Sequence, residues 1–253
     1  MEGYASSSYG DGFADVYDAW YREVTDTDAC VARLLALVPA GGQVLELGVG
    51  TGRLAVPLAL GGVTVTGVDT STAMVSQLRA KPGGEQVRLV LGDMVDLAAT
   101  EPPVPDVARF DLAVAAYNTL FNLTGPGDAA RCLVGVARRL RPGGCLVVEA
   151  FVPRSDPDGR SDSVAISRLS AAELVLTATV HDAEAQTISG QHVQITEGSV
   201  RLRPWMVRYL HPDQLDAAAV AAGLRLEHRG ADWAGAPFDA DSPTHVSVYR
   251  RPS

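Results

Sequence analysis

A glycine-rich segment with an acidic residue two positions before its first glycine is the part of this 253-residue chain best suited to bind a ligand. It runs from Glu46 through Gly48 and Gly50 to Gly52, between a predicted strand and a predicted helix. Glycines there permit a tight turn and let a ligand approach the backbone. Arg53 stands where a dinucleotide fingerprint needs Gly or Ala, and no Gly-Lys-Ser/Thr follows, so that fingerprint and a P-loop are both disfavoured.

Two further acids follow predicted strands. Asp69 ends the second strand, where a carboxylate can accept both hydroxyls of a ribose, although it can instead cap the helix that starts near Ser71. Asp93, followed by Met94, ends the third strand. Because the carboxyl ends of parallel strands meet at one edge of a sheet, these acids and the glycine loop are expected to converge on one crevice.

The elements that must position these residues alternate between apolar β-type runs and helical patterns. That alternation predicts an α/β fold with a parallel sheet covered on both faces. The predicted strands are residues 44–47, 63–68, 87–91, 110–116 and 145–151, and the predicted helices are residues 26–38, 52–60, 71–80, 128–140 and 212–222. Residues 224–228 and 245–249 are expected to pair as an antiparallel hairpin at one edge.

Two regions depart from this alternation. Between residues 163 and 210, apolar residues recur at every second position, which predicts an inserted antiparallel β-hairpin module. Near the start, Phe13, Tyr17, Trp20 and Tyr21 have a spacing that suits one face of a helix. The predicted organisation is a lid segment (1–25), a ligand-binding core (26–155), an inserted β-module for lid and oligomer contacts (160–210) and the C-terminal part of the core sheet (211–253).

Composition narrows the kinds of partner. The chain is 47% hydrophobic and 20% charged, with a net charge of −9, so a globular protein without a basic surface for nucleic acid is expected. No stretch resembles a signal peptide or a membrane span, so a cytoplasmic location without membrane contact is predicted. Neither the three cysteines nor the five histidines have metal-binding or disulfide spacing, so no metal is predicted.

Residues 38–151, together with the terminal strand pair, resemble the class I methyltransferases that use S-adenosylmethionine (SAM). The run Arg141-Pro142-Gly143-Gly144 is similar to the turn before the fifth strand of that family. The resemblance implies a Rossmann-like seven-stranded methyltransferase sheet with an antiparallel terminal hairpin. It also implies that Glu46 orients the amino-acid part of SAM and Asp69 holds the ribose. The implied SAM contacts are Glu46, Gly48, Gly50, Gly52, Asp69, Asp93 and Met94.

Two features resemble a narrower group, the natural-product N-methyltransferases that act on amino sugars and lincosamide antibiotics. One is the opening, Tyr9 followed by the run from Ala14 to Trp20, and the other is the β-insertion that ends in Trp205, Arg208 and Tyr209. That likeness implies methylation of an amine nitrogen of a small molecule in antibiotic biosynthesis. It also implies that the insertion roofs the substrate pocket and builds a homo-oligomer.

The expected site residues follow from the chemistry of methyl transfer. Aromatic faces attract cations, and a phenol can bond an amine, so Tyr9 and Tyr17 are predicted to line the reaction site, with simple packing as the alternative. A hydroxyl acceptor would need a base, for which His211 is the candidate, although it can instead mark the start of a helix. The other histidines are placed on solvated strand faces or in the terminal hairpin. The predicted catalytic residues are Tyr9, Tyr17, Tyr117 and His211, and the predicted substrate contacts are Phe121, Phe151, Trp205 and Arg208.

Three other functions remain open. Small-molecule O-methylation with His211 as the base is the nearest alternative. A nucleic-acid methyltransferase is less consistent with the sequence, because Tyr117-Asn118-Thr119-Leu120 stands where an Asn-Pro-Pro-Tyr-type segment would follow the fourth strand. The third is a module that binds SAM without catalysis.

Overall fold

The computed structural model describes the whole chain except residues 2, 22–23, 105–106, 108 and 154–158. Its main element is a seven-stranded sheet in the order β10-β11-β5-β4-β1-β2-β3. The five strands from β1 to β5 are parallel, whereas β11 is antiparallel to both β5 and β10. The strands are β1 (Gln43–Leu47), β2 (Thr64–Asp69), β3 (Arg88–Leu91), β4 (Phe110–Ala115), β5 (Leu140–Phe151), β10 (Arg225–Gly230) and β11 (Thr244–Arg250). The α/β fold and its antiparallel terminal pair are confirmed.

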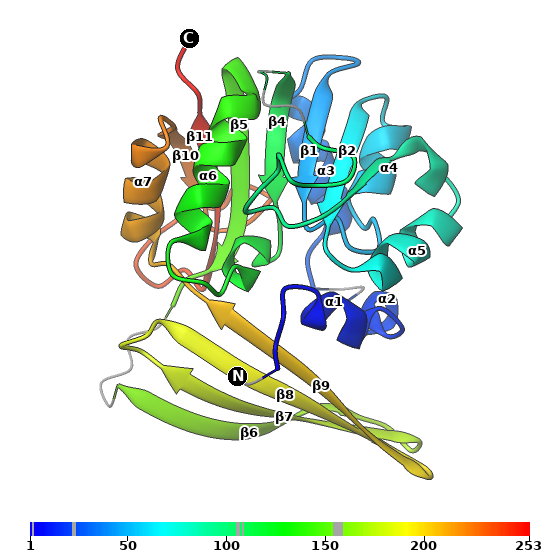
Figure 1. Ribbon diagram of the computed structural model, residues 1–253. Coiled ribbons are helices and arrows are strands. Elements are labelled where there is room, and N and C mark those ends of the chain that lie inside the picture. Colours follow the sequence, from blue (N-terminus) through cyan, green and yellow to red (C-terminus); the bar gives the residue numbers. More distant parts are fainter. Residues whose placement is uncertain (2, 22–23, 105–106, 108, 154–158) are drawn as a thin grey trace.

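Helices cover both faces of this sheet (Figure 1). Neighbouring residues of β1 point to opposite faces: Val44 belongs to the apolar cluster that contains Leu34, Leu58 and Leu78, and Leu45 belongs to the cluster that contains Leu133. Because both faces are buried, the parallel strands are nearly continuous apolar runs. The helices are α3 (Thr27–Ala36), α4 (Ala55–Leu60) and α5 (Thr72–Ala80) over one face and α6 (Asp128–Arg139) and α7 (Pro212–Ala221) over the other. Two short 3-10 helices are η1 (Gly84–Gln86) and η2 (Thr119–Asn122).

The insertion forms a separate antiparallel sheet in the order β6-β7-β8-β9 (Figure 1). The predicted antiparallel β-module is confirmed, and it contains four strands, each of which turns back directly into the next. The strands are β6 (Arg160–Leu169), β7 (Glu173–Asp182), β8 (Thr187–Thr196) and β9 (Ser199–Arg208). The fifth strand of the main sheet is also longer than predicted, since Leu140 already pairs with Phe110 of β4.

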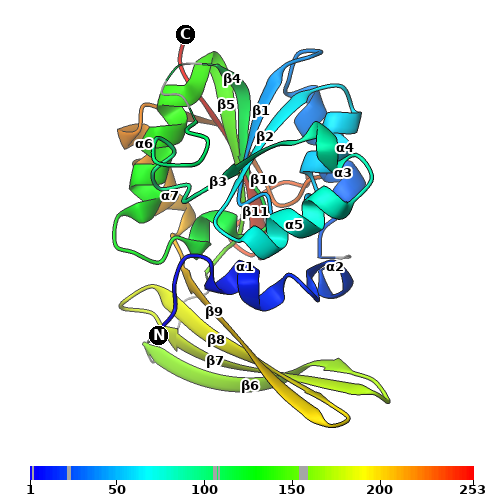
Figure 2. The same ribbon diagram turned by 45° about the vertical axis from the view of Figure 1, so that its right-hand side comes forward.

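The N-terminal segment lies between the two sheets (Figures 1 and 2). The prediction of one helix face for its aromatic residues is wrong, because the segment forms two short helices, α1 (Ser8–Phe13) and α2 (Tyr17–Trp20). The break between them contains Asp15, whose carboxylate oxygen Oδ1 accepts a hydrogen bond of 2.6 Å from the Arg203 guanidinium on β9. The chain thus leaves the helical conformation around Asp15, the residue that forms an ion pair with the second sheet.

Within the described residues, no helix is long and apolar enough to cross a membrane. The same part of the chain contains no group of three or more His, Cys, Asp or Glu side chains arranged to hold a metal ion.

Candidate active site

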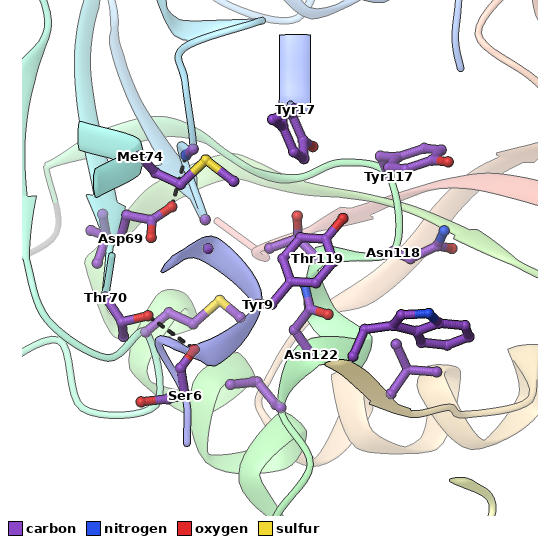
Figure 3. A pocket seen from close by; sticks show the side chains of 18 of the residues that line it. Ser6, Tyr9, Tyr17, Asp69, Thr70, Met74, Tyr117, Asn118, Thr119 and Asn122 are labelled. Atoms are coloured by element: carbon purple, nitrogen blue, oxygen red, sulfur yellow. Dashed lines mark hydrogen bonds between the residues drawn. The ribbon is translucent and has the colours of Figure 1, made fainter. Parts of the chain in front are cut away.

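A cavity of about 430 Å³ lies where the carboxyl ends of the parallel strands face α1, α2 and the second sheet (Figure 3). We call the part lined by the strand ends, from Gly48 to Met94, the loop side. We call the part lined by α1, α2, β8 and β9 the roof side. Tyr117, Asn118 and Thr119, which follow β4, lie in the wall between the two.

The glycine loop is left-handed at alternate residues, with φ values of 61° at Gly48, 54° at Gly50 and 81° at Gly52. A Cβ atom on Gly50 would have only the Gly48 carbonyl oxygen within 4 Å, at 3.9 Å, so the loop is open to the cavity there. A Cβ atom on Gly52 would lie 2.6 Å from Cγ of Leu78. Gly52 therefore lets the loop pack against α5, and it does not line the cavity, unlike Gly48 and Gly50.

Asp69 holds this loop and also faces the cavity (Figure 3). Its Oδ2 atom accepts the N–H of Gly50 at 2.8 Å, and its Oδ1 atom accepts the N–H of Ser71 at 2.8 Å. Burial raises the pKa of the carboxyl group, and these backbone donors act in the opposite direction. The cap of α5 is Ser71, whose hydroxyl accepts the N–H of Met74. Asp93 and Met94 also line the loop side.

Glu46 is the buried acid beneath the loop. It is 5% exposed, and its Oε2 atom has no hydrogen-bond partner among the described residues. Burial raises the pKa of Glu46 to about 8, against the lowering effect of Arg53. A buried carboxyl oxygen without a partner is costly, so this position suits a ligand that brings a cationic donor. The open loop and this carboxyl group together fit the amino-acid part of SAM.

Four tyrosines surround the middle of the cavity: Tyr9, Tyr17, Tyr21 and Tyr117. Ring centroids are 6.5 Å apart for Tyr9 and Tyr17, 4.8 Å for Tyr17 and Tyr21, and 5.9 Å for Tyr21 and Tyr117. Burial raises the pKa of all four phenols, to about 12 for Tyr117. The rings thus form a neutral aromatic cage, which we call the tyrosine cage, and its hydroxyl groups keep their protons.

The turn that carries Tyr117 has an unusual backbone. Tyr117 and Asn118 have φ values of 47° and 63°, a left-handed conformation that is uncommon for residues other than glycine. Two contacts from β5 hold it: Oε2 of Glu149 accepts the N–H of Tyr117 at 2.7 Å, and Oδ1 of Asn118 accepts the N–H of Phe151 at 2.8 Å. Sequence reasoning missed Glu149, although an acid within an otherwise apolar strand was a signal that a partner is needed.

The predicted substrate contacts divide into two groups. Phe151 and Trp205 line the cavity. Phe121 does not, because it is fully buried beneath Phe151, with ring centroids 5.1 Å apart. Arg208 also points elsewhere, donating to the carbonyl oxygens of Thr124 and Ala185.

His228 and His245 lie in the terminal hairpin, as predicted, whereas His211 and His192 are not where the catalytic and solvated-face predictions put them. Among the described residues, the cavity lining does not include His211. It lies at the N-cap of α7, where its backbone N–H donates to Oε1 of Gln214 at 2.9 Å. Its contacts thus match the helix-boundary interpretation. His192 was expected on a solvated strand face, yet it lines the roof side. The alternating pattern of β8 showed that its two faces differ but not which one the rest of the molecule covers.

Known proteins similar to this chain share its fold, and the matching region includes the glycine loop. A methyltransferase domain family matches residues 44–144. The cypemycin N-terminal methyltransferase of Streptomyces sp is 27% identical over 97% of this chain and 98% of its own length. The solved structure of the CcbJ methyltransferase from Streptomyces caelestis is 38% identical, covers 99% of this chain and 100% of that one, and superposes with a TM-score of 0.87. DesVI from Streptomyces venezuelae, at 21% identity and a TM-score of 0.65 over 95% of this chain and 98% of its own, shares the fold.

The chain therefore belongs to the class I SAM-dependent methyltransferases. It is an enzyme that uses SAM as its methyl donor.

Proposed function

We propose that this enzyme transfers a methyl group from SAM to an amine nitrogen of a small molecule in the biosynthesis of a lincosamide-like or amino-sugar antibiotic. The tyrosine cage is the observation that carries the proposal. Aromatic faces attract cationic groups, and four of them surround the middle of a cavity whose loop side suits SAM. The name of the cypemycin relative, which describes methylation of an N-terminus, supports an amine acceptor.

We assign the SAM contacts to Glu46 beneath the loop and, on the loop side, to Gly48, Gly50, Asp69, Asp93 and Met94. When bound, SAM supplies a methyl group already activated by a sulfonium. The carboxyl group of Glu46 would hold the amino group, and Asp69 would hold the ribose while its bonds to Gly50 and Ser71 keep the loop in place. Gly52 acts through packing alone.

On the roof side, the residues align the acceptor and exclude water. Tyr9 and Tyr17 are on α1 and α2, Tyr117 comes from the opposite wall, and Phe151 with Trp205 adds apolar surface. A neutral amine nitrogen held close to the methyl group needs little further help, because alignment and desolvation account for much of the rate in such transfers. The raised pKa values of the tyrosines mean that their hydroxyls serve as hydrogen-bond donors rather than as bases.

O-methylation with His211 as the base is less well supported. A hydroxyl acceptor needs a base at the reaction centre, and His211 lies at the start of α7 rather than in the described lining of the cavity.

The test is a set of matched acceptors incubated with methyl-labelled SAM. The set contains amino sugars, N-methylamino sugars, secondary cyclic amines and a peptide with a free N-terminus, each beside its hydroxyl counterpart. We expect label in amines only, at a rate that a chelator does not change. Label in the hydroxyl compounds would contradict the proposal and favour O-methylation. So would activity that a chelator abolishes and magnesium restores.

We also propose that the protein forms homo-oligomers through the second sheet. The face of that sheet remote from the cavity exposes Val164, Ile166, Val200 and Leu202, each more than 60% accessible. Contiguous apolar surface of this kind favours association. Light scattering should give a mass above that of one chain, and Ile166→Glu with Leu202→Glu should reduce it. A single-chain mass at all concentrations would contradict the proposal.

A further inference from the structure

His192 lies on the roof side of the cavity at the middle of β8, paired across the strands with Thr177 on β7 and Arg203 on β9. Its Nδ1 atom is 2.5 Å from Oγ1 of Thr177, and that hydroxyl also bonds the hydroxyl of Ser167 on β6. The Thr177 hydroxyl, itself bonded to Ser167, thus holds one ring nitrogen against the sheet. The second nitrogen, Nε2, is therefore the one available to the cavity.

The surroundings of His192 are aromatic on several sides. Its ring centroid is 5.5 Å from that of Phe13, 5.9 Å from that of Trp20 and 6.1 Å from that of Trp205. Such a half-buried position disfavours an added positive charge on the imidazole ring.

The positive charge of Arg203 acts in the same direction as burial. Arg203 on β9 is next to the His192 ring, partly balanced by its ion pair with Asp15, and Arg168 on β6 lies over the ring of Trp20. Burial, followed by the charge of Arg203, lowers the pKa of His192 below its ordinary value. A lowered pKa means that the imidazole is neutral throughout the neutral range and becomes protonated only in more acidic solution.

An amine acceptor needs a base before it can react. At neutral pH an ordinary aliphatic amine is an ammonium ion, and its nitrogen has no free electron pair with which to attack a methyl group. The tyrosines of the cage keep their protons, since burial raises the pKa of each. The two carboxylates of the lining are on the loop side, where Asp69 already accepts two backbone N–H groups and Asp93 accepts that of Val95. Among the described residues that line the cavity, His192 is the remaining neutral base.

We propose that Nε2 of His192 takes the proton from the bound ammonium group of the acceptor, and that Thr177 orients the imidazole for this step. This role rests on the proposed N-methylation. The N–H bond of the ammonium breaks, its electron pair stays on nitrogen, and the proton passes to Nε2. The freed nitrogen then forms a bond to the methyl carbon as the bond from carbon to sulfur breaks and sulfur keeps its electrons. The imidazolium returns one proton to water after the product leaves, so one proton is released for each methyl group transferred.

The first experiment compares His192→Gln with wild type, using an amine that the wild-type enzyme methylates in the set above. At neutral pH we expect kcat/KM to fall at least about tenfold, within the range of general-base effects. The loss should shrink as pH rises through the pKa of the amine, because the free amine then binds directly. Affinity for S-adenosylhomocysteine should remain unchanged, and His228→Gln, at an exposed position on β10, is the matched control.

Three further variants separate catalysis from packing. His192→Ala should regain activity when imidazole is added, whereas Thr177→Val should lose activity several-fold and Thr177→Ser should keep it. A wild-type rate in His192→Gln at neutral pH, an equal loss at every pH, or no response of His192→Ala to imidazole would overturn the role of His192. If wild type methylates no amine in the set, the proposed function itself fails.

A spectroscopic measurement needs no acceptor. In protein labelled with ¹⁵N-histidine and saturated with S-adenosylhomocysteine, the signals lost in His192→Gln identify His192. We expect Nδ1 to carry the proton and Nε2 to be bare at neutral pH. A proton on Nε2 would overturn the proposal, since that nitrogen could not then accept another from the acceptor.

Discussion

The loop side of the cavity comes from one contiguous part of the chain, residues 48–94, whereas the roof side is assembled from segments almost 200 residues apart, such as α1 and β9. On the loop side, the main contacts run between backbone and carboxylate at neighbouring strand ends, as between Asp69 and Gly50. On the roof side, they run between side chains of distant elements. Arg203, only 1% exposed, contacts the carboxylate of Asp15, the carbonyl oxygen of Gly12 and Oε1 of Gln194.

The loop side and the roof side should therefore respond differently to mutation. Backbone donors of the loop side are held by the parallel sheet, so that side is preorganised for its ligand. The roof side is attached by polar contacts, including the one between Asp18 of α2 and the hydroxyl of Thr51 in the glycine loop. Because α1 and α2 are outside the main sheet, they can move without disturbing it. Damage to the loop side should therefore abolish SAM binding, and damage to the roof side should mainly reduce turnover.

The largest effect is expected from Gly50→Val. A β-branched residue at a φ of 54° is strained, and its side chain would occupy the opening above the loop. We expect no measurable SAM binding by calorimetry in a folded variant. Gly62→Val is the matched control, because Gly62 also has a positive φ, of 91°, but faces open space outside the cavity. Normal SAM affinity in Gly50→Val would show that the glycine loop is not part of the SAM-binding site.

Asp69→Ala should weaken SAM binding by about 2–3 kcal/mol, the value of a charge-assisted pair of hydrogen bonds. The variant should remain folded, as judged by circular dichroism. If its affinity for SAM matches that of wild type, the ribose contact lies elsewhere.

The carboxyl group of Glu46 predicts a pH dependence of SAM binding. Its pKa of about 8 means that the free protein carries a proton there at pH 7, whereas a cationic partner requires the ionised form. Binding at pH 7 should release close to one proton, and affinity should rise about tenfold per pH unit up to about pH 8. Calorimetry in buffers of different ionisation enthalpy measures the proton directly. The same proton release from Glu46→Gln would assign it to another group.

The roof side is tested through its tyrosines. Tyr9→Ala removes an aromatic wall, and Tyr17→Phe removes a hydroxyl group. At least one of the two should lower kcat/KM about tenfold, or about 1.4 kcal/mol, with little change in SAM affinity. Full activity in both variants would show that the acceptor does not bind next to α1 and α2.

The smallest effect is expected from Asp15→Asn. Its carboxylate is 46% exposed, so the ion pair with Arg203 is partly screened, and the amide can still accept a hydrogen bond. We expect a loss of turnover of a few fold and faster proteolysis of the N-terminal segment. A larger loss in SAM affinity than in turnover would contradict the separation of the two sides.

The sequence by itself determined the parallel core and the residues of the loop side. Apolar runs of strand length followed by helical patterns leave few alternatives to a covered parallel sheet, and strand ends in such a sheet meet at one edge. The positions of Glu46, Gly50 and Asp69 followed from that local order, because their environment is set by residues near them in the chain.

Only the tertiary structure decided which residues form the roof side. Alternation along β8 separates its two faces but does not say which one α1 and α2 cover, so His192 was assigned to solvent although it lines the cavity. The aromatic spacing of residues 13–21 predicted one helix, whereas the pairing of Asp15 with Arg203 occurs at a break between two. Glu149 was missed for the same reason, since its partner is the backbone of Tyr117 in the turn that follows the neighbouring strand β4. Contacts between distant segments depend on how whole elements pack, and no local pattern in the sequence contains that information.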